Sequence, residues 1–271
     1  MLDAFRELLT LERTKRLGVV SPQMLNSVVG LVKSQLAKAE KRQEKRAAAG
    51  DEDDEGDDEE KEADLELLST ACNAIGEMLR LHGAAALPTV ESQLMPHVQK
   101  WFSSEEPAFK ALALTVFNHV IEHAGREHNK KYVAAVLPVL AATTMLSDAA
   151  PSAEDASLRQ AAVAGLGIVA EHGGKLLSRN AATEAGRQML ALLQQPEAKF
   201  SSNVEASEAA AITLGKLLVH RTASLDASIA LPEFLAWVPP PSTRTPLEHR
   251  HSDPCGGAVA RSRCDPGLDP G

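Results

Sequence analysis

The sequence predicts an all-α fold, a HEAT-repeat α-solenoid built from stacked antiparallel helix pairs. A short motif recurs as A-x-x-A-I-G at residues 71–76, A-x-x-G-L-G at 162–167 and A-x-x-T-L-G at 210–215, with a weaker copy ending at Asn118. The last residues of the copies are 42, 49 and 48 positions apart. A period of roughly 40–47 residues is typical of HEAT and armadillo arrays. The chain is also rich in alanine and has little strand-like alternation.

Two further marks keep the same phase as the motif. A glycine stands seven residues after the motif's last residue in three copies, at the position where a helix ends in a left-handed turn: Gly83, Gly125 and Gly174. A proline stands twenty residues after it in two copies, while Arg187 occupies the third place and the last copy has its proline after seventeen residues. The shared phase indicates a helix pair as the repeating unit.

Glycine inside a helix costs about 1 kcal/mol relative to alanine. The motif repeats that cost, so we expect a neighbouring helix to approach closely at each glycine. The predicted structural repeat positions are Gly76, Gly167, Gly215, Pro96, Pro138 and Pro232.

Residues 1–50 are expected to form an incomplete leading repeat. Residues 1–16 are predicted as one helix, and Ser21 and Pro22 begin another. The second helix has one apolar face, with Leu25, Val28, Val29, Val32 and Leu36. Its end is basic, from Lys38 to Arg46, and could pair with the acidic residues that follow.

Residues 51–64 hold eleven acidic residues and one lysine, so they account for a charge of −10 in a chain of net charge −9. The rest of the chain is therefore nearly neutral. We predict an acidic disordered loop here, either a solvated insertion or an anionic arm that attracts a basic partner. The candidate residues for binding a basic partner are Asp51, Glu52, Asp53, Asp54, Glu55, Asp57, Asp58, Glu59 and Glu60.

Residues 65–238 are predicted to hold four HEAT-like repeats, in each of which the glycine-bearing helix comes first. Pro107 fits the first position of a helix, and Asp155 is the expected cap of the third glycine-bearing helix. Residues 239–271 contain seven prolines and four glycines without apolar periodicity, which predicts a disordered tail.

The composition argues against a membrane span and against a disulfide framework. The longest apolar stretch without charge, Tyr132–Ser147, is shorter than the ~20 residues that a bilayer needs. Three cysteines are consistent with a reducing compartment.

Few residues point to catalysis. His119, Glu122 and His123 spell H-x-x-E-H, an inverted zinc-protease signature, but the same residues fit the polar last turn of a repeat helix. The tail residues His249, His251, Cys255 and Cys264 fit no common zinc-finger spacing. Gly173–Lys175 and Gly215–Lys216 lack the remaining residues of a phosphate loop. We therefore predict a protein that is not an enzyme, with no catalytic residues, no cofactor and no metal ligands.

Several stretches together resemble one family, and the resemblance covers roughly residues 17–239. They are FNHVIE at 117–122, RQAAVAGLGIVAEHGG at 159–174, NVEASEAAAITLGK at 203–216 and LPEFLAWVP at 231–239. LMP at 94–96 and the basic-then-acidic passage at 38–64 agree with them. The sequence resembles the importin-β (karyopherin-β) superfamily, in its importin-5 or karyopherin β3 branch. It departs from the family pattern at His119, Arg187 and the whole tail after Pro239.

The resemblance implies a nuclear import receptor: a superhelix that binds protein cargo with basic localisation signals, FG nucleoporins and the GTPase Ran. It implies localisation in cytoplasm and nucleus, including the nuclear pore, with no membrane and no direct nucleic acid partner. The main Ran contact region of the family is expected to be absent from this segment. Candidate nucleoporin grooves lie near Leu112, Leu114 and Val163, residues that could equally belong to the core.

The helical ladder begins mid-array and stops at Pro239, so we expect a C-terminal piece of a longer carrier. Two alternatives belong to other classes: a HEAT-repeat scaffold subunit of another multiprotein complex, such as a phosphatase or chromatin assembly, and a metalloenzyme.

Overall fold

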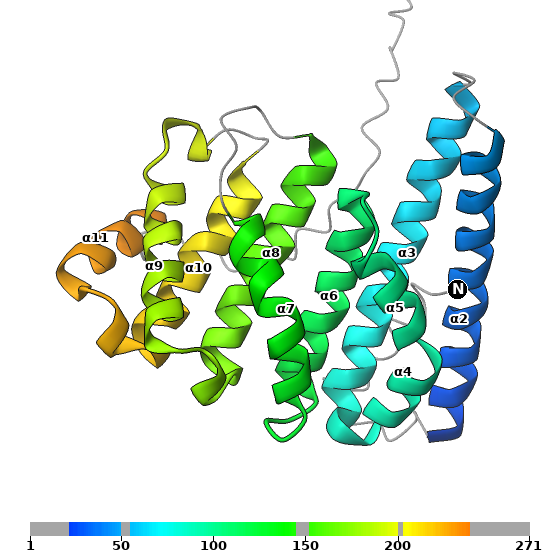
Figure 1. The fold of residues 1–271 in the computed structure, drawn as a ribbon, viewed down its shortest axis with the longest axis horizontal. Helices are drawn as coiled ribbons and strands as arrows, with labels where there is room; N and C mark the ends of the chain where they lie inside the picture. The colour runs from blue at the N-terminus through cyan, green and yellow to red at the C-terminus, as the bar shows by residue number, and fades with distance from the viewer. Residues whose placement is uncertain (1–21, 50–54, 145–151, 200–202, 239–271) are drawn as a thin grey trace, which may run out of the picture. The chain divides into compact units, whose positions relative to one another are not determined.

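The computed structural model describes residues 22–49, 55–144, 152–199 and 203–238. These residues form α-helices joined by short loops and 3-10 turns, with no strand among them, and the predicted all-α solenoid is confirmed (Figure 1). The α-helices are α2 (Pro22–Ala49), α3 (Glu55–His82), α4 (Leu87–Gln93), α5 (Met95–Phe102), α6 (Pro107–His123), α7 (Asn129–Thr143), α8 (Ala153–His172), α9 (Arg179–Leu193), α10 (Val204–His220) and α11 (Ala227–Trp237).

The four helices that carry the repeated motif, α3, α6, α8 and α10, are called the glycine helices below. They lie side by side, each in contact with the next, and the contacts of α8 with α6 and α10 are the most extensive in the molecule. Helices α5, α7 and α9 pack against this row, and α4 contacts α2 and α5.

The order within a pair differs from the prediction. Helix α6 contacts α5 more extensively than α7, and α8 contacts α7 far more than α9. The glycine helix therefore comes second in these pairs. The sequence could not distinguish the two orders, because on both sides a connection of ten residues or fewer joins the glycine helix to another helix.

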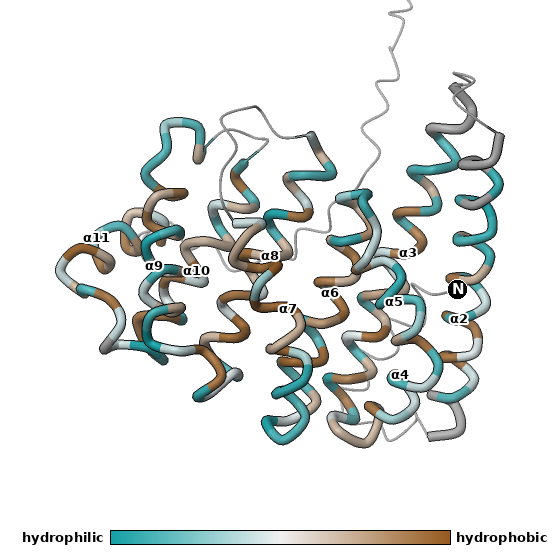
Figure 2. Tube along the Cα trace, in the orientation of Figure 1, coloured by the Kyte–Doolittle hydropathy of each residue, from teal (hydrophilic) through white to brown (hydrophobic). Residues whose placement is uncertain are grey.

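The core lies between the row of glycine helices and the helices packed on it. Hydrophobic residues recur along α6, α7 and α8, while hydrophilic residues gather at helix ends (Figure 2). Aliphatic side chains and alanines fill most of this core, as the low aromatic content of 3% predicts. The largest fully buried side chains are Trp101, Leu36, Leu68, Ile75, Met78, Leu79, Leu94, Leu114, Ile121, Leu140 and Leu166.

The helix ends follow local chemistry. Gly83, Gly125 and Gly174 have φ angles of +53°, +93° and +55°, so the predicted left-handed turns are confirmed. Pro107 occupies the first turn of α6, also as predicted. The prediction that Asp155 caps α8 is wrong, because the capping residue lies three residues earlier. Ser152 caps α8 by accepting a hydrogen bond from the Asp155 backbone N–H, and its own hydroxyl is 2.8 Å from Asp155 Oδ2.

The repeat prolines share an exposed position. Pro96 lies in the first turn of α5, while Pro138 and Pro232 lie inside α7 and α11. All three are exposed to solvent. On that side of a helix, water can satisfy the carbonyl that loses its helical hydrogen bond to proline. Arg187, at the equivalent place in α9, forms an ion pair with Glu184 instead.

The acidic segment departs from its prediction as a loop. Residues 51–54 lie outside the described residues, but the helix α3 begins at Glu55, so residues 55–64 are helical. Carboxylates near a helix N-terminus are favoured by the helix dipole. At the end of the segment, Arg42 of α2 donates through both Nε and Nη2 to the Asp64 carboxylate. This contact confirms a pairing of the basic and acidic passages at one point.

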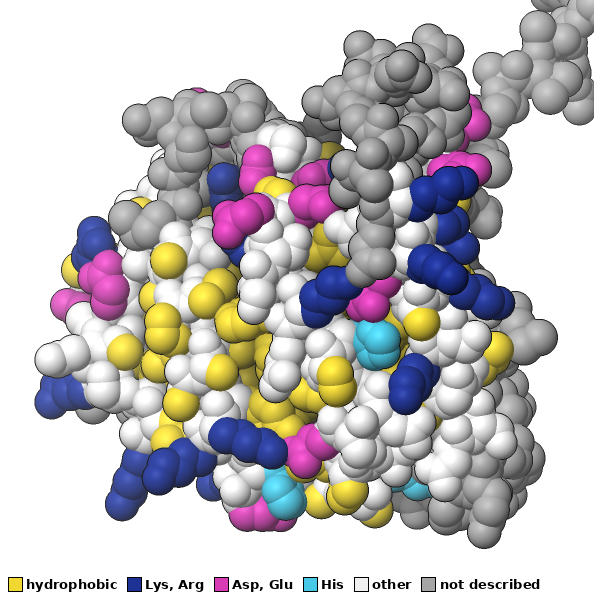
Figure 3. Space-filling view, turned by 45° about the vertical axis from the view of Figure 1, so that its right-hand side comes forward, with side chains coloured by type: hydrophobic (Ala, Val, Ile, Leu, Met, Phe, Trp, Pro, Cys, Tyr) yellow, Lys and Arg dark blue, Asp and Glu magenta, His cyan; other side chains and the backbone are white. Residues whose placement is uncertain are grey.

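The described surface carries no single dominant charge on the face shown in Figure 3. Hydrophobic side chains gather across the middle of this face, with acidic and basic side chains around them. In the described part of the chain, no helix has both the length and the apolar character that crossing a membrane requires. The predicted leading helix, residues 1–16, and the predicted tail, residues 239–271, lie outside the described residues.

Helices α4 and α7 are joined by a charged cluster whose strength depends on pH. Lys131 and Tyr132 both donate to Glu91 Oε1, and the hydrogen bond from Lys131 is the main reason that the pKa of Glu91 is lowered. A carboxyl whose pKa is lower in the folded state stabilises the fold above its unfolded pKa, and this stabilisation is lost as the pH falls through the folded pKa.

We expect Lys131→Gln to lower the free energy of unfolding at pH 7 by about 0.5 kcal/mol, because the pair is partly exposed and screened by solvent. The loss should shrink towards zero as the pH falls below the unfolded pKa of the carboxyl, about 4.3. Urea unfolding of both proteins at pH 7 and pH 3.5 measures the two differences. Lys130→Gln, at the neighbouring exposed lysine, is the control, and an equal loss at both pH values would contradict the expectation.

Candidate binding groove across the glycine helices

A groove of about 780 Å³ runs across three of the glycine helices, α3, α6 and α8. Its lining mixes small apolar residues with amides, hydroxyls and charged groups. From α3 come Lys61, Glu62, Leu65, Ser69 and Asn73; from α6 Ala108, Ala111, Leu112, Thr115, Asn118, His119 and Glu122; from α8 Ala153, Glu154, Ser157, Gln160, Ala161, Ala164 and Ile168.

The repeated glycines let neighbouring helices approach closely, including α3 and α6 of the groove. A Cβ atom on Gly76 would lie 2.5 Å from Nε2 of His119, and one on Gly167 would lie 2.6 Å from Oγ1 of Thr213. At Gly215 the neighbour is the ring of Phe234, at 2.8 Å. Each glycine therefore makes room for a side chain of the next element, and the close approach predicted from the motif is confirmed.

Two side chains tie neighbouring glycine helices together through hydrogen bonds. Asn118 of α6 donates from Nδ2 to the carbonyl of Ala161 in α8, at 3.0 Å. Thr213 of α10 donates from Oγ1 to the carbonyl of Val163 in α8, at 2.9 Å. Both side chains are buried, so the bonds are shielded from water and fix the register of the helices.

The charges that line the groove are mainly acidic. Glu122 lines the groove near the end of α6, whereas Glu62 and Glu154 lie at the opposite end with the single lysine of the lining, Lys61, whose Nζ is 3.2 Å from Glu154 Oε1. Glu59 and Glu60 are exposed on the preceding turn of α3. This end of the groove therefore offers carboxylates to a partner of positive charge.

Two histidines of α6 lie near the other end of the groove: His119 lines it, and His123 is one turn further along the helix. The pKa of His119 is lowered to about 4, mainly by burial and in addition by the neighbouring His123. Burial also lowers the pKa of His123, while Glu122 acts in the opposite direction. Because both pKa values are below the ordinary value of about 6.5, both rings are neutral at pH 7.

The predicted binding residues are only partly visible. Asp51, Glu52, Asp53 and Asp54 lie outside the described residues, and Glu55, Asp57 and Asp58 belong to the first turn of α3. Glu59 and Glu60 are helical and exposed. The tail residues His249, His251, Cys255 and Cys264 lie outside the described residues as well.

The residues named for nucleoporin grooves divide between groove and core. Leu112 lines the groove, whereas Leu114 and Val163 are fully buried in the core. The sequence did not identify the polar lining residues Asn73, Thr115 and Gln160. The repeat did contain a signal for one lining position. Asn73, Thr115 and Ala164, which all line the groove, each stand three residues before the last residue of the motif.

Comparison with known proteins agrees with this architecture. Residues 4–104 match the Importin repeat 6 family, a span that includes α2 to α5. The structure of Kap121p bound to RanGTP superposes with a TM-score of 0.62 at 17% sequence identity, covering 81% of this chain and 18% of Kap121p. The described helices have the fold of part of Kap121p.

Other Kap121p structures agree. Kap121p bound to Ste12p gives a TM-score of 0.62 at 16% identity, over 81% of this chain and 19% of the other. Kap121p bound to Pho4p gives 0.61 at 17% identity, over 82% and 19%. The chain thus spans less than a fifth of the length of the Kap121p chains that it matches.

Proposed function

We propose that this chain is a segment of a karyopherin-type nuclear transport receptor of the importin-β superfamily, and that it binds basic segments of protein cargo in the groove across α3, α6 and α8. The observation that carries the proposal is the groove itself, with its acidic end next to the acidic first turns of α3. The importin repeat match and the Kap121p fold support the receptor class.

Kap121p has been crystallised with RanGTP, with Ste12p and with Pho4p. By analogy we propose protein cargo and Ran as partners of the receptor to which this segment belongs, together with FG nucleoporins from the family resemblance. The branch is proposed as importin-5 or karyopherin β3, and the location as cytoplasm and nucleus, including the pore. The role is binding, with no chemical step.

A groove-filling substitution tests the binding site directly. Ala164 lines the groove on α8, so Ala164→Arg places a long cation there. We expect this variant to weaken binding of a fluorescein-labelled, lysine- and arginine-rich localisation peptide at least about tenfold, since it blocks space and repels a basic partner. Fluorescence anisotropy measures the affinity. The matched control is Ala135→Arg, at an exposed position of α7 outside the groove.

The contribution of the acidic residues needs substitutions rather than a deletion. Deleting residues 51–64 would remove Asp64, which Arg42 holds, and would shorten α3. Glu59→Gln combined with Glu60→Gln leaves the helix intact. We expect it to weaken peptide binding at low salt and to reduce the salt dependence, because exposed charges act through a screened field. If neither the groove variant nor the acidic variant changes the affinity for the peptide, the proposed site is wrong.

The alternative function is a HEAT scaffold subunit of another complex. A pull-down with FG-repeat peptides and GTP-loaded Ran discriminates the two classes, because a receptor binds at least one of them and a scaffold binds neither. The third alternative, a metalloenzyme, is not supported by the residues that line the groove. The charged residues among them do not form an acid–base pair beside a nucleophile.

A further inference from the structure

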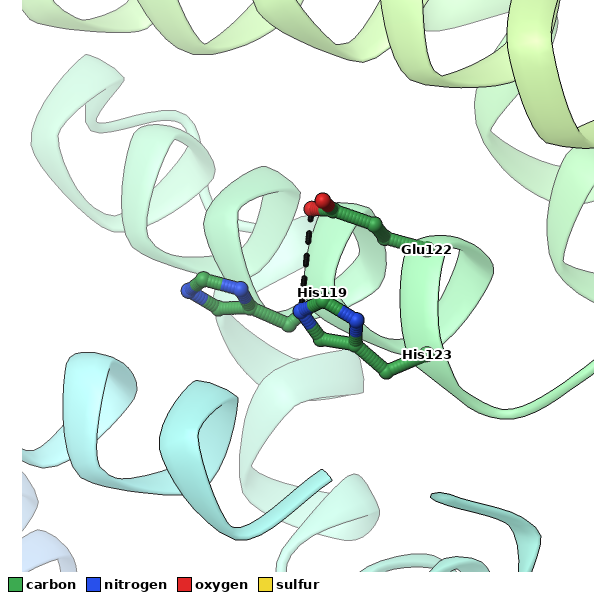
Figure 4. A group of neighbouring side chains, drawn as sticks. All are labelled: His119, Glu122 and His123. Atoms are coloured by element: carbon green, nitrogen blue, oxygen red, sulfur yellow. Dashed lines mark ion pairs between the residues drawn. The ribbon is translucent and has the colours of Figure 1, made fainter. Parts of the chain in front are cut away.

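Three metal-binding side chains converge at the end of α6. His119, Glu122 and His123 each offer one ligand atom, and these atoms all lie within 4.8 Å of one another. Figure 4 shows the side chains extending from consecutive turns of the helix, with Glu122 directed towards His123. The spacing explains the convergence, because residues three and four apart lie on the same face of a helix.

The two imidazoles lack the partners that buried rings normally have. Nε2 of His123 is buried and has no hydrogen-bond partner among the described residues. Nε2 of His119 also lacks one, but it lies against Gly76 of α3. The Glu122 carboxylate oxygen Oε2 lies 3.7 Å from His123 Nε2, which is too far for a hydrogen bond. The rings are nearly parallel, with centroids 6.1 Å apart and an interplanar angle of 16°. Buried polar atoms in folded proteins usually have a partner, so Nε2 of His123 calls for one.

We propose that His119, Glu122 and His123 bind a Zn²⁺ ion, with water completing the coordination. Two imidazoles and one carboxylate are ligands that suit zinc, whereas calcium and magnesium prefer oxygen ligands alone. Donors about 2.0–2.1 Å from a tetrahedral ion lie about 3.4 Å apart, so the side chains must close by roughly 1 Å. The Glu122 side chain is 30% exposed and has room to make this movement.

One cationic side chain acts on both rings. The charge of Arg80 in α3 lowers the pKa of His119 and of His123, and Glu77 pairs with Arg80 at 3.5 Å. Gly76 leaves the space that the His119 ring occupies against α3. The proposed site therefore departs from the sequence-based expectation of no metal ligands. It is a binding site that shares His119 and Glu122 with the groove lining, it does not rest on the proposed transport function, and it involves no reaction.

The repeat itself supplies a comparison. In α8 the equivalent positions hold Ile168, Glu171 and His172, so the first histidine is replaced by an apolar residue. His172 Nε2 lies 3.7 Å from Glu171 Oε1, the same separation as between His123 and Glu122. The α8 copy has two of the three ligands, which makes His172→Gln a matched control for His123→Gln.

The test uses the full chain, freed of metal with a chelator and then titrated with ZnCl₂ by calorimetry, with metal analysis after gel filtration. We expect one Zn²⁺ per chain. Both His123→Gln and Glu122→Gln should weaken binding at least about tenfold, whereas His172→Gln should leave it unchanged. With Co²⁺ in place of zinc, the parent should show the visible absorption of a four-coordinate ion, and His123→Gln should lose it.

A second variant keeps the tail cysteines from confusing the result. Cys255→Ser combined with Cys264→Ser should still bind one Zn²⁺ with the parental affinity. Absence of stoichiometric zinc in the parent would overturn the proposal. So would parental affinity in His123→Gln, or loss of binding in the double cysteine variant. Circular dichroism of each variant shows that the helices are intact, and Glu122→Gln gives a second ligand change if His123→Gln does not fold.

Discussion

Replacing Trp101 with alanine is expected to lower the free energy of unfolding by about 3–5 kcal/mol, the range for removing a buried tryptophan from a core. Trp101 is the largest fully buried side chain, with 2% of its surface exposed. It lies at the end of α5, and its ring packs against that of Phe109 in α6, with centroids 6.3 Å apart. Alanine would leave a cavity between the two helices of one pair.

Two comparisons make the expectation specific. Trp101→Phe should cost much less, because Nε1 of Trp101 has no hydrogen-bond partner among the described residues and a phenyl ring loses no such bond. Trp237→Ala should also cost less, because Trp237 is half-buried at the end of α11. Urea unfolding followed by circular dichroism measures all three variants. Equal losses for Trp101→Ala and Trp237→Ala would show that the cavity argument is wrong.

Gly167→Ala is expected to destabilise the fold although alanine favours helices. The new Cβ atom would lie 2.6 Å from Thr213 Oγ1 and 3.3 Å from the Thr213 Cα atom, so α8 and α10 would have to separate. Overpacking of this kind costs about 1–3 kcal/mol. The better helix propensity of alanine returns about 1 kcal/mol, so we expect a net loss of about 1–2 kcal/mol.

Gly30 provides the matched control for this prediction. It lies inside α2, is exposed, and has no atom within 4 Å of the position that a Cβ would take. Gly30→Ala should therefore stabilise the fold by up to about 1 kcal/mol. Thermal or urea unfolding of the two variants should give changes of opposite sign. A stabilising Gly167→Ala would contradict the role assigned to the glycines in helix packing.

Much of this packing could be predicted from the sequence, because the glycines keep a fixed phase with other marks. Gly76 and Gly167 indicated close helix contacts, and Gly125 indicated a left-handed turn, since only glycine meets both needs at low cost. The order of helices within a pair could not be predicted, because it depends on which of two short connections brings helices into fuller contact.

The acidic segment shows why charge alone is a poor guide to local structure. Its high charge predicted a loop over residues 51–64, but residues from Glu55 onwards are helical. The stabilising contact is tertiary, between Arg42 and Asp64, which are 22 residues apart in sequence. Composition carries no information about such a contact.

The candidate groove was predictable only in part. The sequence singled out His119, Glu122 and His123 through their spacing on one helix, and the structure brings their ligand atoms close together. The groove itself needs three helices in register, which side chains such as Asn118 hold through a bond to Ala161. That partner lies 43 residues away, and no local pattern identifies it.

These hydrogen bonds also give the stack an uneven mechanical compliance. The row of glycine helices is tied by buried bonds from Asn118 and Thr213, whereas α8 and α9 contact one another only slightly. Bending that separates α8 from α9 therefore stretches few contacts, but bending that separates α6 from α8 across the groove must break the hydrogen bond from Asn118 to Ala161. The groove should therefore keep its width while α9 moves more easily relative to α8.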